Sequence, residues 1–151
     1  MGKNEMLIEL AKTKDMYEQV FKFLYNTSFN DETDHLIKME LSKNISVNED
    51  ILEKLAKEDS NEIRASVMKH KNATEKMFRG ALKDEDLTVR ENAILNKNIS
   101  EAVLIEFLKD ESEKIRNLAK KELTAKWNWY FKEVKENEPS MFSRKTCKWT
   151  L

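Results

Sequence analysis

The chain has 151 residues, of which 40% are hydrophobic and 36% charged, with two glycines, one proline and a net charge of −1. This length allows one domain with a sizeable core. The scarcity of glycine and proline favours helices joined by short polar turns. The chain lacks the strong basic excess that is typical of a dedicated nucleic-acid binder. Its single cysteine, Cys147, excludes an internal disulfide. We therefore expect an all-α protein.

The first residues contain no apolar run long enough for a signal peptide or a membrane span. The sequence therefore predicts a cytoplasmic protein that does not contact membranes. Within 5–25, apolar residues at helical spacing predict one or two amphipathic helices that cap the N-terminal end. Turn-forming residues follow, and then a helix over 34–44. Leu36 in this helix aligns with Ile63 of the unit that follows, so we interpret the helix as a degenerate first repeat.

Residues 45–123 contain one unit written three times, over 45–72, 73–98 and 99–123. The pairs that mark the register are Ile63-Arg64, Val89-Arg90 and Ile115-Arg116. The interval from Ile63 to Val89 equals that from Val89 to Ile115, and we call it the repeat period. Self-similarity at such a period is typical of stacked helical units, each of which cannot bury its apolar face alone. We expect a right-handed α-solenoid with helical caps at both ends, as one domain over 1–137.

Each unit is predicted to be a helix, a turn and a second helix. Ser46, Thr74 and Ser100 are expected to cap the first helices, with a capping box over 46–49. Acidic runs precede the second helices, whose N-termini favour negative charge. The residues predicted to be buried between units are Leu55, Val67, Ala81, Ala93, Phe107 and Ala119.

The units resemble the leucine-rich repeat variant class of HEAT-like repeats. The matching stretches run from Leu55-Ala56 to Ile63-Arg64 and from Leu82-Lys83-Asp84 to Val89-Arg90, and include Asn96-Lys97-Asn98-Ile99-Ser100. The resemblance covers about half of the chain and implies a binding scaffold. The prolines that usually follow the asparagine in this class are absent. No cysteine cluster for an iron–sulfur centre is present either, so we expect no cofactor.

An arginine recurs in each unit, at Arg64, Arg90 and Arg116. One hypothesis is a track that binds anions or phosphates. The other is that each guanidinium pairs with an acidic turn residue of its own or the adjoining unit, as charge-assisted bonds favour. The acids that would serve recur at the same spacing, which favours pairing: Glu58, Asp84 and Asp110.

Polar joints are predicted where one unit meets the next. The Asn-x-Ser/Thr triplets match the repeat register, so we interpret them as helix ends and caps and not as glycosylation sites; they begin at Asn26, Asn44, Asn72 and Asn98. Neither His35 nor His70 has a companion at metal-ligand spacing, so no metal site is predicted. His70 takes the place of Asn96 in the next unit, which indicates a joint.

An aromatic cluster follows the last unit. Helical spacing continues through Leu123, Trp127 and Tyr130 to Val134, so the last helix is predicted to run to about residue 137 and to seal the final repeat with a capping extension over 124–137. Trp129 lies off that face. Trp149 lies in the basic tail, 138–151. Aromatic and basic residues together can also stack nucleic-acid bases or anchor a protein interface.

The second helices are predicted to form the face that binds another protein. Its residues are Met68, Lys69, Glu91, Ile94, Leu95, Asn117, Lys120 and Lys121. Leu95, beside Ile94 and near Met68, would form a small apolar centre with a charged rim, the usual anatomy of an interface. In an alternative, the N-terminal helices or the tail after Pro139 cover this patch.

A second function class remains open, that of a nucleic-acid binder similar to the HEAT-like DNA glycosylases. It would use the arginine column and the basic aromatic tail. Enzyme activity is not expected, and no catalytic residue is predicted. The sequence offers no nucleophile with a base, no glycine loop for phosphate, and no carboxylate pair outside the repeating turns.

Overall fold

The computed structural model of the chain describes residues 2–14, 17–27 and 31–137, and these form nine α-helices and no strand, which confirms the all-α class. The helices are α1 (Lys3–Lys12), α2 (Glu18–Asn26), α3 (Asp31–Lys43), α4 (Glu49–Leu55), α5 (Asn61–Lys69), α6 (Glu75–Ala81), α7 (Leu87–Leu95), α8 (Glu101–Phe107) and α9 (Glu113–Asn137). None of these helices is both long and apolar enough to span a bilayer.

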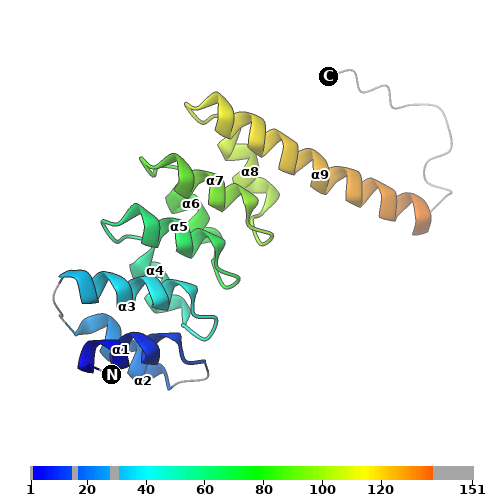
Figure 1. The fold of residues 1–151 in the computed structure, drawn as a ribbon. Coiled ribbons are helices and arrows are strands. Elements are labelled where there is room, and N and C mark those ends of the chain that lie inside the picture. The colour runs from blue at the N-terminus through cyan, green and yellow to red at the C-terminus, as the bar shows by residue number, and fades with distance from the viewer. Residues whose placement is uncertain (1, 15–16, 28–30, 138–151) are drawn as a thin grey trace, which may run out of the picture.

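The helices lie in two rows (Figure 1). Helices α1, α3, α5, α7 and α9 contact one another in series, and α4, α6 and α8 pack behind them. We call α3, α5, α7 and α9 the second-helix row, because α5, α7 and α9 are the second helices of the predicted units. Contacts between alternating helices are consistent with a helical repeat.

The core confirms the burial that the repeat period predicted. All six residues expected between units are buried, with exposed fractions of 3% or less. They come from both rows, so each helix pair closes its apolar face against its neighbours. The largest buried side chains include Phe21, Phe78 and Phe107. One continuous apolar cluster runs from Ala11 in α1 to Leu123 in α9.

The register predicted for α3 is wrong by one residue. Leu36 was aligned with Ile63, but Leu36 is 42% exposed, whereas Ile37 is fully buried. Ile37 precedes Ile63 by the regular repeat period, the interval that also separates Ile63 from Val89. One step along a helix turns a side chain by about 100°, which is enough to move it from the core to solvent. With this correction α3 follows the same spacing as α5 and α7.

In the earliest full unit, the cap of the first helix lies two residues later than predicted. Asn48, and not Ser46, caps α4, and its side chain accepts a hydrogen bond from the Ile51 N–H. Asn48 is the residue in register with Thr74 and Ser100, which do precede α6 and α8. Of these two, Ser100 alone accepts a cap bond. Second helices α5 and α7 are capped from within the acidic runs, by Ser60 and Asp86.

Helix α9 runs to Asn137 as predicted, but its second half does not seal the last repeat. Ala119 and Leu123 are buried, whereas Trp127 is 46% and Tyr130 57% exposed. The physical reason is length: α8 has seven residues and α9 has 25. The end of α9 therefore projects beyond the row behind it (Figure 1).

Candidate partner-binding face

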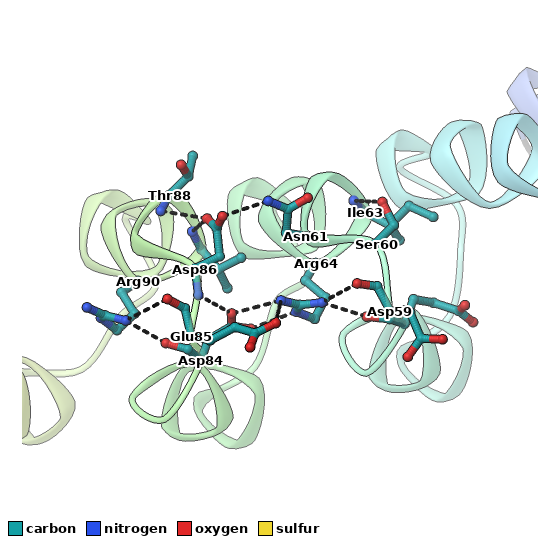
Figure 2. Close-up of polar contacts among 12 residues, drawn as sticks. Asp59, Ser60, Asn61, Ile63, Arg64, Asp84, Glu85, Asp86, Thr88 and Arg90 are labelled. Atoms are coloured by element: carbon teal, nitrogen blue, oxygen red, sulfur yellow. Dashed lines mark hydrogen bonds and ion pairs between the residues drawn. The ribbon is translucent and has the colours of Figure 1, made fainter.

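The arginine column is fixed by backbone carbonyls of the turn that precedes each second helix. Each guanidinium donates through Nη1 to two carbonyls of its own turn, at distances between 2.6 and 3.4 Å. The carbonyl pairs belong to Glu58 and Asp59 for Arg64, Asp84 and Glu85 for Arg90, and Asp110 and Glu111 for Arg116. Figure 2 shows this arrangement for Arg64 and Arg90. The turns thus share one geometry.

The same guanidinium groups also reach the next unit. Arg64 binds both carboxylate oxygens of Asp84, Nε to Oδ2 at 2.7 Å and Nη2 to Oδ1 at 2.9 Å (Figure 2). The hydrogen bond to Asp84 raises the pKa of Arg64 despite its burial. Arg90 Nε lies 3.0 Å from Asp110 Oδ2. The predicted pairing is therefore confirmed for Arg64 and Arg90, with acids of the adjoining unit.

The two ends of this column differ. Lys38 of α3, which stands one repeat period before Arg64, pairs with Glu58 at 3.0 Å and so repeats the contact. At the other end Arg116 makes no ion pair with any carboxylate in the part of the chain that the structure describes. The first three cations of the column are thus engaged in joining units and are not available as an anion track.

A second column of polar side chains joins the C-terminal ends of the second helices. Asn44 Nδ2 donates to the Ala11 and Thr13 carbonyls at 2.6 and 2.8 Å. Asn96 Nδ2 donates to the carbonyls of Met68 and His70 at 2.7 and 3.0 Å. These bonds satisfy carbonyls that the end of a helix leaves without a partner. They confirm the predicted polar joints.

His70 takes the central place in this column. Its Nδ1 accepts from the Asn72 N–H at 3.1 Å, so the proton sits on Nε2, which donates to the Asn44 carbonyl at 3.0 Å. Burial lowers the pKa of His70; the carbonyl of Asn44 acts against this, and the charge of Lys71 adds to it. His70 is therefore a neutral joint. Among the described residues no group of three His, Cys, Asp or Glu side chains is placed to hold a metal.

Two of the residues predicted to bind a partner are buried. Met68 and Ile94 are each 1% exposed. Each lies five positions after the first apolar core residue of its helix, Ile63 or Val89, which turns its side chain by about 140° from that residue. Met68 lines a hollow with Met77 of α6 and Val89 of α7, so it lies within the stack and not at the solvent-exposed face. The expectation of an exposed apolar centre formed with Leu95 is corrected accordingly.

The remaining predicted residues lie on the surface of the second-helix row. Leu95 is 55% exposed, and Glu91 is half-buried and forms an ion pair with Lys114. The exposed polar members are Lys69, Asn117, Lys120 and Lys121. Helices α1 and α2 pack at the α3 end, so they leave Leu95 uncovered. The tail, 138–151, lies outside the described residues.

An open groove crosses this face, and the sequence interpretation missed it. It has a volume of about 720 Å³ and runs over α3, α5 and α7, between Met39, Ile45, Lys69 and Lys71. A second hollow of about 400 Å³ adjoins it, shares Lys69 and Lys71, and extends to Leu95 and Lys97. We call the two hollows together the lysine groove. The signal for it is visible in the sequence as lysines spaced by one repeat period.

The exposed aromatic residues of α9 lie apart from the groove. Trp127 Nε1 donates to Glu101 Oε2 at 3.0 Å, which holds the indole against the start of α8. Trp129 is 65% exposed. Trp149 and the basic residues around it lie outside the described residues.

Comparison with known proteins returned no match: no family model matches the chain, and neither does any curated protein or any solved structure.

Proposed function

We propose that this chain is a non-enzymatic protein-binding module, built as an α-solenoid of the leucine-rich repeat variant type, and that the second-helix row holds its partner. The observation that carries the proposal is Leu95, a large apolar side chain 55% exposed at the edge of an open groove. Interfaces concentrate binding energy in a few apolar or aromatic anchors within a polar rim. Leu95 with Lys69 and Lys97 has that composition.

The repeated contacts support the solenoid part of the proposal. Lys38, Arg64 and Arg90 each pair with an acid in the turn that precedes the next second helix. Asn44 donates to a backbone carbonyl near the end of α1, and Asn96 donates to one near the end of α5. Units joined by the same contacts at each step stack into an extended array, whose second helices offer several units to one partner.

A nucleic-acid function has less support. In that hypothesis the arginine column binds phosphates, but Arg64 and Arg90 already pair with Asp84 and Asp110. The net charge of the chain is −1, which gives little long-range attraction for a polyanion.

The proposal is tested by a pair of charge substitutions at exposed apolar residues. Leu95→Glu alters the second-helix row, whereas Ile105→Glu makes the same chemical change on α8, where Ile105 is 45% exposed. Each variant is used to capture proteins from a nuclease-treated lysate at low and moderate salt, with quantitative mass spectrometry as the readout. Melting temperatures of both variants are measured in parallel.

We expect at least one protein to be captured by the unaltered chain and by Ile105→Glu, and lost with Leu95→Glu, at equal melting temperatures. Apolar contacts persist at moderate salt, whereas phosphate binding falls steeply. Capture that disappears with nuclease, or that is indifferent to Leu95→Glu, would contradict the proposal.

A further inference from the structure

Two columns of residues line the lysine groove, each with one member per repeat. The first contains Lys43, Lys69 and Leu95, and the second contains Ile45, Lys71 and Lys97, with one repeat period between successive members. The first column ends the second helices, since α3, α5 and α7 finish at Lys43, Lys69 and Leu95. The second column lies two residues further along, in the turns. The groove therefore meets the same two positions of each unit in succession.

The charge of the groove is mainly positive. Lys69, Lys71 and Lys97 are exposed and form no ion pair within the described residues, while Lys43 pairs with Glu40 at 3.1 Å. The groove is lined by one carboxylate, that of Glu62. The helix dipole stabilises a lysine at a helix C-terminus, which would explain such a lysine without a ligand. Lys71 and Lys97, however, lie beyond the ends of α5 and α7. Their charges are thus directed to solvent over the groove.

A different lysine column lies next to acidic residues in the sequence. Lys57, Lys83 and Lys109 recur at the same period in the turns at the other end of the second helices, and each is followed directly by an acid. Those acids are Glu58, Asp84 and Asp110. The groove lysines have no such neighbour: Lys71 and Lys97 are each followed by asparagine.

Each column also contains one apolar residue. Ile45 is 40% and Leu95 55% exposed, at opposite ends of the groove. A surface that binds polyphosphate gains nothing from such residues, because phosphate contacts come from charged and hydrogen-bonding groups. A peptide that carries both carboxylates and apolar side chains matches both features at once.

We propose that the lysine groove binds an extended acidic peptide of the partner protein, with carboxylates on Lys69, Lys71 and Lys97 and apolar side chains on Ile45 and Leu95. This inference rests on the proposed function and specifies its ligand. Packed helices lie about 8 to 10 Å apart and an extended chain advances about 3.3 Å per residue. The peptide therefore presents an acid at about every third residue.

The test is a titration of the whole chain followed by nitrogen–proton correlation spectra. The probe is a synthetic peptide with aspartate at every third position and one leucine beside the central aspartate. A second peptide has lysine in place of each aspartate, and a single-stranded oligothymidylate of equal charge serves as the nucleic-acid probe. The variant Lys69→Glu/Lys71→Glu is compared with Lys83→Glu/Lys109→Glu, which changes the net charge equally.

We expect the acidic peptide to shift amide signals around Lys69, Lys71 and Leu95, and to bind at least about tenfold more weakly to Lys69→Glu/Lys71→Glu. The Lys83→Glu/Lys109→Glu variant and the unaltered chain bind it alike. Added salt weakens the binding, since the contacts are exposed charges.

Three results would overturn the inference: equal loss with both double variants, equal binding of the lysine peptide, or shifts caused by the oligothymidylate but not by the acidic peptide. Absence of any shift at millimolar peptide would also overturn it. The proposed function would fail separately, through indifference of protein capture to Leu95→Glu.

Discussion

Replacing Arg90 with methionine tests whether the arginine column holds the units together. Methionine keeps most of the apolar stem but removes the guanidinium. In the structure that group reaches the Asp84 carbonyl at 2.6 Å and the Asp110 carboxylate at 3.0 Å. The side chains of Arg90 and Asp110 are only 6% and 4% exposed. The substitution therefore leaves a buried carboxylate without its counter-charge.

The expected loss follows from that burial. Removing one partner of a buried ion pair destabilises a protein by about 3 to 5 kcal/mol, and for a chain of this size each kcal/mol lowers the melting temperature by about 2 to 4 °C. Arg116→Met is the matched control. Arg116 donates to two carbonyls of its own turn and pairs with no carboxylate among the described residues, so its loss costs about 1 to 2 kcal/mol.

Urea unfolding at neutral pH gives the free energy of unfolding of both variants. The double variant Arg90→Met/Asp110→Asn shows how much of the loss comes from the unpaired Asp110 carboxylate. We expect Arg90→Met to cost clearly more than Arg116→Met, and the second substitution to restore part of the loss. Equal costs for the two single variants would refute the structural role of the column. So would a stable Arg90→Met chain that loses protein capture, because Arg90 would then be a recognition residue.

Three further predictions concern the core, the histidine joint and the exposed aromatic end. Phe107→Ala should lower the unfolding free energy by about 3 to 5 kcal/mol, measured by urea unfolding; an unchanged midpoint would contradict the repeat register. His70 has a lowered pKa in the folded chain, so the unfolded chain takes up the proton first and stability should fall as the pH drops below about 6.5. His70→Asn, which copies Asn96, should flatten that part of the stability–pH curve, and an identical curve would contradict the neutral joint. Trp127→Ala should cost under about 1 kcal/mol because the ring is half exposed, and a larger drop in melting temperature would show that the end of α9 is packed.

The repeat period was sufficient to predict the paired helices and the residues buried between them. Val67, Ala93 and Ala119 are buried because the repeat places them at one position of each second helix. The cation column was also predictable, since Asp84 and Asp110 recur with the arginines. Repetition carries this information because each unit meets the same neighbours.

The errors arose where a residue's environment depends on a second neighbour. Met68 and Ile94 were expected on the outer face, but both are buried in the stack, where Met68 lines a hollow with Met77 of α6 and Val89 of α7. Trp127 has an apolar helical spacing, but it lies against the first residue of the seven-residue α8 and stays 46% exposed. The lysine groove was missed for a related reason: its members come from three helices, although the sequence shows Lys43 and Lys69 at the repeat spacing.

The most direct test of the account is site-specific photo-crosslinking from position 95. A photoreactive phenylalanine analogue replaces Leu95 in one chain and Ile105 in another, and both chains are irradiated in lysate. The account predicts a protein adduct from position 95 that is absent from position 105 and reduced by Lys69→Glu/Lys71→Glu, with the crosslinked peptide rich in acidic residues. An adduct formed equally from both positions, or none from position 95, would contradict it.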